Sequence, residues 1–220
     1  MIPNIFVSGM AVPKHGKTHF SCSFPAPIAL FSFDLGAKFV VTKFPDKKID
    51  VFQYTIPVVD TTKPQAWELD LYKQVRKDFD AACQSKEYKT IVLDPATVLW
   101  EIVRHAYMRE KNYENMPDLK YVEPNARMSY FLMEPLVMGK NLVSLCHLRD
   151  EYLNGDRTGN KEMDGFKRTN NIADIVLLLE RRKKEFFGTI LDCRFDPQLN
   201  DVELQNPTYN DLITLLGWSQ

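Results

Sequence analysis

The sequence predicts an α/β fold with a mostly parallel central sheet, helices on its flanks and an antiparallel hairpin near the C-terminus. Two observations lead to this prediction. Short apolar runs alternate with segments of helical periodicity, and a Gly-Lys-Thr tripeptide follows the first apolar run. We expect one domain, residues 1–220, because 220 residues with 45% hydrophobic and 26% charged content are ordinary for a single soluble domain.

The first predicted unit is a strand, a tight loop and a helix. An apolar run at residues 4–9 precedes the loop at 11–18, and residues 19–23 can open a helix. This layout is typical of a phosphate-binding P-loop, where backbone N–H groups of the loop and of the helix N-terminus converge on phosphate oxygens. The residues expected to contact a nucleotide are Ala11, Val12, Pro13, Lys14, His15, Gly16, Lys17, Thr18 and His19.

The residue types of this loop suit phosphate chemistry. Lys17 is expected to reach the β- and γ-phosphates, and the Thr18 hydroxyl to ligate Mg²⁺. Gly16 lets the backbone approach the phosphates without a clash from a Cβ atom. The motif formula has glycine where this chain has Ala11, which costs little unless the backbone there needs a positive φ. A chance turn before a surface helix is the alternative, and the preceding apolar strand favours the P-loop.

Further strands and helices follow in alternation. Residues 27–34 are predicted to form a buried strand that ends in Asp34, and residues 51–54 another strand. Residues 64–85 are predicted to be helical, because apolar side chains recur there at spacings of three and four: Trp67, Leu71, Val75, Phe79 and Ala82 or Cys83.

The apolar run at residues 88–94 ends in Asp94. It fits a central parallel strand that delivers a carboxylate at its C-terminal edge. In P-loop proteins this is the Walker B position, where an aspartate holds Mg²⁺ directly or through water. Thr18 and Asp94 are therefore the predicted metal ligands, with ATP and Mg²⁺ as the predicted cofactors.

The second half of the sequence continues the pattern and then departs from it. We expect a helix at 97–111, a polar loop at 112–125, a helix at 126–139 and a strand at 141–147 that ends in His147. Residues 148–171 hold three glycines and several charges, so they are predicted to be an irregular, functional loop. A strand at 172–180, a turn at 181–185 and a strand at 186–195 predict the hairpin, and residues 209–216 a final helix.

Composition narrows the function classes. The net charge is −1, so nucleic-acid binding would have to use a local basic patch. The four cysteines form no Cys-x-x-Cys pair, which disfavours a zinc or redox site and suits buried thiols in a reducing compartment. No signal peptide and no membrane-spanning run is expected, so the predicted location is cytoplasmic, the host cytoplasm if the chain is phage-encoded.

The order of these motifs resembles the RecA-like recombinase core, and more closely the small phage ATPases of the Sak type, which anneal single-stranded DNA. The P-loop, the strand ending in Phe33-Asp34, the Asp94 strand and the strand into His147 carry this resemblance, over about residues 5–216. It implies a RecA-like P-loop ATPase that binds single-stranded DNA and promotes annealing or homologous recombination. It also implies a homo-oligomer, a ring or filament, with a single-stranded-DNA-binding protein as a candidate partner and no membrane.

The resemblance also implies roles for single residues. Lys17, Asp94, Asp34 and His147 would be catalytic, with His147 as a sensor of the γ-phosphate. The loop after His147 would bind DNA, with phosphate contacts from Arg149, Lys161, Lys167 and Arg168 and base stacking by Phe166. The family has a glutamate where this chain has Gly36, so either Asp34 orients the attacking water or hydrolysis is slow.

Two other functions fit the same P-loop. A small-molecule kinase would use Arg149 and Arg157 as residues of a lid over the phosphates. A nucleotide-binding scaffold without catalysis would fit Ala11 and the missing glutamate. His147 equally fits an ordinary hydrogen-bonded histidine, and the basic residues of the loop equally fit solvated surface charges.

Overall fold

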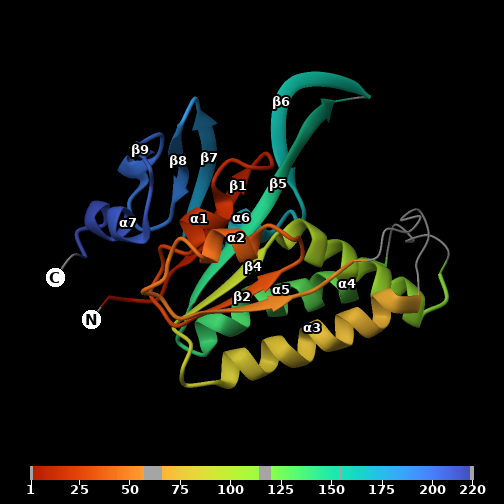
Figure 1. Cartoon of the computed structure of the whole chain (residues 1–220). Coiled ribbons are helices and arrows are strands. Elements are labelled where there is room, and N and C mark those ends of the chain that lie inside the picture. Colours follow the sequence, from red (N-terminus) through yellow and green to blue (C-terminus); the bar gives the residue numbers. More distant parts are fainter. Residues whose placement is uncertain (1, 57–65, 114–119, 154, 219–220) are drawn as a thin grey trace.

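One nine-stranded sheet organises the chain (Figure 1). The computed structural model describes residues 2–56, 66–113, 120–153 and 155–218. Along the sheet the strands follow the order β3-β2-β4-β5-β1-β7-β8-β9, and β6 pairs with β5. The strands are β1 (Phe6–Ala11), β2 (Ile28–Ser32), β3 (Ile49–Gln53), β4 (Thr90–Asp94), β5 (Asn141–Leu153), β6 (Asp156–Asp164), β7 (Ile175–Arg182), β8 (Glu185–Cys193) and β9 (Glu203–Gln205).

Helices cover both faces of the sheet. One hydrophobic core lies under α3, α4 and α5, and a second core lies on the other face with α1, α2 and α7 (Figure 1). The helices are α1 (Lys17–Ser21), α2 (Ala37–Val41), α3 (Ala66–Gln84), α4 (Ala96–Glu110), α5 (Val122–Val137), α6 (Thr169–Ile172) and α7 (Tyr209–Leu215), with a 3₁₀ turn at η1 (Pro197–Leu199).

The predicted fold class is confirmed. The six strands from β3 to β7 are parallel, and β7, β8 and β9 pair antiparallel at the C-terminal end of the chain. The register places Ala11 beside His147 and Ser32 beside Asp94. Because parallel strands end at the same edge, the P-loop, Asp94 and His147 meet at one edge of the sheet.

The helices form where the sequence has an apolar face. In α3, Val75, Phe79 and Cys83 are buried at spacings of four, and in α4 Leu99 and Val103 are buried in the same way. β4 is buried along its whole length, as expected of a strand covered by helices on both faces. The last helix, α7, begins at a capping box in which Thr208 and Asp211 exchange hydrogen bonds.

Some predicted elements were wrong in their bounds or in their type: the strand predicted from residue 172 begins at Ile175, after α6. α5 begins at Val122, before the predicted residue 126, because Pro124 falls in the first turn, where a proline removes no intrahelical hydrogen bond. Residues 148–171 are not an irregular loop: β5 runs on to Leu153 and pairs antiparallel with β6.

The β5–β6 hairpin rises away from the body of the molecule (Figure 1). Opposite charges face one another across it, since Arg149 lies opposite Glu162 and Asp150 lies opposite Lys161. Such cross-strand pairs stabilise an exposed ribbon that has little apolar surface to bury.

None of the helices in the described ranges is both long and apolar enough for a membrane crossing.

Candidate functional site

The loop after β1 adopts the backbone conformation that its residues predict. Lys14 and Gly16 have φ values of 68° and 85°, and α1 begins directly afterwards at Lys17. Ala11 lies in the extended backbone of β1 and has no positive φ. The alanine at this position therefore introduces no backbone strain, and the departure from the motif formula leaves the loop intact.

Two features require a glycine at position 16: its positive φ and the close approach of Phe186. A Cβ atom at Gly16 would lie 2.7 Å from Cδ1 of Phe186, at the start of β8. The β7–β8 hairpin also contacts the loop through the backbone, because Arg181 N donates a hydrogen bond to His15 Nδ1 (3.1 Å). The P-loop is thus held against a hairpin about 170 residues further along the chain.

Lys17 is buried and bonded to the loop's own backbone. Its ammonium group donates to the carbonyl oxygens of Ala11 (2.9 Å) and Val12 (3.2 Å). Burial lowers the pKa of Lys17, while the nearby carboxylates of Asp94 and Asp34 oppose that shift. The ammonium group of Lys17 therefore lies beside the loop, at the P-loop cavity, and is bonded to carbonyl oxygens.

Thr18 and Asp94 meet as predicted for the metal ligands. The Thr18 hydroxyl donates to Asp94 Oδ2 at 2.5 Å. Asp94 is 2% exposed, and burial is the main reason why its pKa rises from 3.8 to about 6. The Asp34 charge adds to this rise, whereas the Thr18 hydrogen bond and Lys17 oppose it.

These side chains open onto one cavity of about 430 Å³, which we call the P-loop cavity. Its volume falls in the range of small-molecule sites. It brings together Lys17, Thr18, Asp34, Asp94 and His147, which are the predicted catalytic and metal-binding residues. Its lining is Pro13, Lys14, Gly16, Lys17, Thr18, His19, Asp34, Gly36, Val40, Lys43, Asp94, His147 and Phe186.

Three predicted nucleotide contacts do not line this cavity. Ala11 and Val12 instead supply the carbonyl groups that hold Lys17, and His15 accepts from the β7 backbone. In their place the structure adds Val40, Lys43 and Phe186. No local sequence signal identifies Phe186, because only the paired β7–β8 hairpin brings it to Gly16.

Asp34 lies just after β2 and is exposed. Its Oδ1 accepts a hydrogen bond from Gly36 N at 2.9 Å, which fixes the carboxylate near the start of α2. Asp34 and Gly36 both line the P-loop cavity. The structure therefore places a carboxylate where the expected glutamate is missing.

His147 is half-buried at the cavity and is bonded to Thr97, for which the sequence predicts no role at the site. Its backbone N donates to Thr97 Oγ1 (2.9 Å), and Thr97 Oγ1 donates to the carbonyl oxygen of Asp164 (2.5 Å). Burial and the Lys17 charge lower the pKa of His147, so its imidazole is neutral at pH 7. Thr97 thus joins the start of α4 to β5 and to the end of β6.

The predicted DNA-binding residues have diverse surroundings. Arg149 pairs with Glu162 at 2.8 Å, and Lys161 pairs with Asp150. Phe166 is 4% exposed and packs against Trp100, with ring centroids 5.1 Å apart. The prediction that Phe166 stacks on a base is therefore wrong for this structure, because its ring is part of the core.

Lys167 and Arg168 remain exposed beside Phe166. Among the residues that the structure describes, no ion pair includes either of them. The two arginines suggested for a kinase lid, Arg149 and Arg157, pair with hairpin carboxylates and do not line the P-loop cavity. Their position gives no support to the kinase alternative.

Comparison with known proteins agrees with this geometry. A family model described as "AAA domain" matches residues 6–204, which is most of the chain. No curated protein matches the chain. The matched range includes the P-loop, Asp94, His147 and the β7–β8 hairpin, and so the chain belongs to the AAA domain family of P-loop NTPases.

Proposed function

We propose that this protein is a Mg²⁺-dependent ATPase whose nucleotide state controls its binding to single-stranded DNA, as in the phage annealing proteins that its sequence resembles. One observation carries the ATPase proposal. The Thr18 hydroxyl and the Asp94 carboxylate lie 2.5 Å apart in the P-loop cavity, on which Lys17 also opens.

Lys17 can exchange partners when a nucleotide binds. Its present acceptors are neutral carbonyl groups, and a phosphate oxygen is a stronger, charged acceptor. The ammonium group then neutralises charge on the transferred phosphoryl group, while the N–H groups at the start of α1 bind phosphate oxygens. The left-handed backbone at Lys14 and Gly16 shapes the loop for this contact.

Thr18 and Asp94 fit a Mg²⁺ ion in their chemistry. Both offer oxygen, the ligand atom that Mg²⁺ prefers, and the described residues contain no cluster of three or more ligating side chains. A two-residue site suits Mg²⁺, which keeps phosphate and water ligands. When bound, the ion would supply charge neutralisation at the phosphates. Deprotonated Asp94 is the form that can hold it.

Asp34 and His147 flank Asp94 at the edge of the sheet: Asp34 follows β2 and His147 lies in β5, and these two strands are the neighbours of β4. Both residues would act on the bound nucleotide. Asp34 is the cavity carboxylate available to orient the attacking water, because it is exposed and, among the described residues, only Oδ1 of its two carboxylate oxygens accepts a hydrogen bond, from Gly36 N. Neutral His147 keeps one N–H donor for a phosphate oxygen. Through Thr97, a shift of His147 would reach Asp164 and the residues after it.

Phe186 supplies an aromatic wall for the nucleoside. Its ring lies against Gly16, on the same cavity as Lys17 and Thr18. An aromatic ring beside a phosphate loop suits stacking on a base. The Arg181 guanidinium, 5.8 Å from the ring centroid, adds positive charge on this side of the site.

The DNA part of the proposal is supported by Lys167 and Arg168. Both are exposed, and both lie shortly after Asp164, the last residue of β6, whose carbonyl oxygen accepts the hydrogen bond from Thr97. They are the predicted DNA contacts that are not already neutralised by a carboxylate in the described structure. Removing two phosphate contacts should reduce the slope of log affinity against log salt by roughly 1.4 for single-stranded DNA.

The test is ATP hydrolysis with and without single-stranded DNA, beside Lys17→Ala and the pair Lys167→Gln with Arg168→Gln. We expect DNA to raise turnover, Lys17→Ala to abolish it, and the Lys167/Arg168 pair to lose only the stimulation. Lys73→Gln with Lys77→Gln, two exposed lysines of α3, is the matched control for charge. Hydrolysis that ignores DNA would refute the DNA part alone, and hydrolysis that survives Lys17→Ala would refute the whole proposal.

A further inference from the structure

The backbone of Asp34 is held by side chains from two neighbouring strands. The carbonyl oxygen of Asp34 accepts hydrogen bonds from Ser32 Oγ (2.7 Å) and from Gln53 Nε2 (2.6 Å). Ser32 is the last residue of β2, and it lies opposite Gln53, the last residue of β3. Two side-chain donors therefore converge on one carbonyl group beside the P-loop cavity, which Asp34 lines.

The same contacts join the turn after β2 to both neighbouring strands. Gln53 Nε2 also donates to the carbonyl oxygen of Ser32 (3.2 Å), which ties the ends of β2 and β3 together. On the other side of β2, Phe33 N donates to the carbonyl oxygen of Asp94 (2.8 Å). The backbone that carries Asp34 is thus bonded to β3 on one side and to the strand of the proposed metal ligand on the other.

The position of this backbone decides where the Asp34 carboxylate lies. A single methylene group joins an aspartate carboxylate to the main chain, so the carboxylate follows any movement of the backbone closely. Displacement of a catalytic group by about 1 Å can lower a rate by about 100-fold. A site that relies on Asp34 to orient water therefore needs the backbone of Asp34 to be fixed.

Gln53 carries a burial penalty that a residue serving only the fold would avoid. Its Oε1 is buried, and no donor in the part of the chain that the structure describes reaches it. An unpaired buried amide oxygen destabilises a fold, whereas an apolar side chain of similar length would fill the same place without that loss. The contacts of Gln53 are therefore explained better by the position that they give to Asp34 than by stability.

We propose that Gln53 and Ser32 are positioning residues for Asp34: they fix its carbonyl group so that its carboxylate can orient the attacking water. This role rests on the proposed ATPase function. Neither residue is among the described residues that line the P-loop cavity, so neither is placed to contact the nucleotide. Loss of either should lower kcat and leave KM and the affinity for ATP unchanged.

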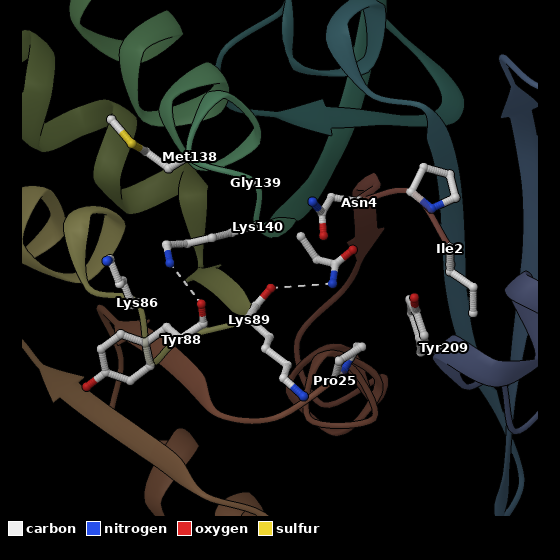
Figure 2. A pocket seen from close by; sticks show the side chains of 12 residues that line it. Ile2, Asn4, Pro25, Lys86, Tyr88, Lys89, Met138, Gly139, Lys140 and Tyr209 are labelled. Carbon is white, nitrogen blue, oxygen red and sulfur yellow. Dashed lines mark hydrogen bonds between the residues drawn. The ribbon is translucent and has the colours of Figure 1, made fainter.

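A control for side-chain bonds to backbone carbonyls exists at the opposite end of the sheet. Lys140 lines a second cavity, of about 410 Å³, where β1, β4 and β5 begin (Figure 2). It is buried, and its Nζ donates to the carbonyl oxygens of Ser85 (2.6 Å) and Tyr88 (2.8 Å). Lys140→Met removes these two bonds and changes no residue of the P-loop cavity. It should lower the free energy of unfolding and leave kcat as in wild type.

The experiment is a double-mutant cycle on ATP turnover by the full-length chain, measured with enzyme in excess over ATP. Gln53→Met keeps the length of the side chain and removes its N–H donors, while Asp34→Ala removes the carboxylate and keeps the backbone carbonyl. We expect Gln53→Met to lower the rate constant of hydrolysis roughly 10- to 100-fold in wild type, with the affinity for ATP unchanged. In the Asp34→Ala background the same change should alter the rate constant by less than about twofold, because Gln53 acts only through the carboxylate. Ser32→Ala should follow the same pattern.

Several outcomes would overturn the positioning role. They are an equal fractional loss in both backgrounds, a wild-type rate that neither Gln53→Met nor Ser32→Ala lowers, weaker ATP binding without a slower reaction, and a loss of rate in Lys140→Met as large as that in Gln53→Met. Denaturant unfolding checks that each variant is folded in the assay, and if one of the two variants does not fold, the other decides.

Failure of this role can be told apart from failure of the proposed function. If no hydrolysis depends on Lys17, the ATPase function is refuted and the positioning role with it. If Asp34→Ala keeps the wild-type rate, the roles of Asp34 and Gln53 are refuted while the Mg²⁺-dependent ATPase remains. Hydrolysis that needs Lys17 and Asp34 but is indifferent to Gln53→Met and Ser32→Ala refutes the positioning role alone.

Discussion

The P-loop cavity and the β5–β6 hairpin are both rich in charged side chains, but they satisfy those charges differently. In the hairpin, Arg149 faces Glu162 and Lys161 faces Asp150, so these opposite charges pair across the strands. In the cavity, Lys17 is bonded to carbonyl groups and Asp94 to a hydroxyl. Charges held only by neutral partners beside a hollow are available to a ligand, whereas paired charges maintain the shape of a surface ribbon.

Replacing Asp94 should give the largest effects, and in opposite directions: a lower ATP turnover and a higher free energy of unfolding. Asp94→Asn removes the carboxylate that would hold Mg²⁺, and turnover should fall at least about 100-fold. The same change should stabilise the nucleotide-free protein by up to about 3 kcal/mol at pH 7.5, because the wild-type fold raises the pKa of this group from 3.8 to about 6.

The pH dependence has a definite sign. A carboxyl group with a raised pKa destabilises the fold where it is ionised, and this penalty disappears as the pH falls from about 6 to about 4. The advantage of Asp94→Asn in denaturant unfolding should shrink over that range. If Asp94→Asn is instead less stable than wild type at pH 7.5, the Asp94 charge is stabilised by its surroundings, as the paired carboxylates of the hairpin are.

Gly16→Ala tests how tightly the cavity is built. The positive φ alone should cost about 1–2 kcal/mol of unfolding free energy. Displacement of the Phe186 ring should add to that loss and weaken ATP binding. Gly159→Ala in the hairpin is a matched control, since its φ is 86° and no atom lies within 4 Å of the added Cβ. If the two substitutions lower the unfolding free energy equally, the Phe186 ring moves aside without a measurable cost.

Thr97 is the connection between the two regions. Thr97→Val leaves His147 N–H and the Asp164 carbonyl without their partner, which should cost about 1–3 kcal/mol in denaturant unfolding. It should also reduce the stimulation of ATP turnover by DNA more than basal turnover. Thr97→Ser keeps the hydroxyl and should retain the stimulation. If Val and Ser variants respond alike to DNA, Thr97 does not transmit the nucleotide state.

The smallest effect is expected in the hairpin. Lys161→Gln removes one partner of Asp150 and leaves Arg157, 2.6 Å from Asp150 Oδ2, in place. Exposed pairs of this kind contribute little, so the unfolding midpoint should not change measurably. The salt dependence of DNA binding should also be unchanged. A reduced salt slope would instead show that Lys161 leaves Asp150 to contact DNA phosphates.

The sequence was sufficient for the P-loop because that motif is contiguous. Lys17, Thr18 and the residues around them are fixed by a short strand, a loop and a helix start, which local pattern identifies. Asp94 and His147 follow from the rule that parallel strands end at one edge. The cavity confirms that they meet there with Asp34.

Contacts between distant segments could not be predicted in the same way. Phe186 reaches Gly16 only through the pairing of β7 and β8, and Thr97 meets His147 across 50 residues of sequence. The hairpin was mistaken for a loop because its glycines and charges are typical of loops. Its Asn154-Gly155 dipeptide was the sequence signal for a hairpin. The opposite charges come into register only through the register shift between Asp150 and Tyr152, which the sequence does not indicate.

The most direct test of the account is calorimetric titration of ATP into the protein with and without Mg²⁺, for wild type and Asp94→Asn. We expect Mg²⁺ to tighten ATP binding by wild type at least about tenfold at pH 7.5, or about 1.4 kcal/mol. The Asn variant should lose that gain, and in wild type the gain should shrink progressively as the pH falls below 6, because the raised pKa of Asp94 brings its protonation into that range. A Mg²⁺ effect of equal size in both proteins would contradict the assignment of Thr18 and Asp94 as the metal site.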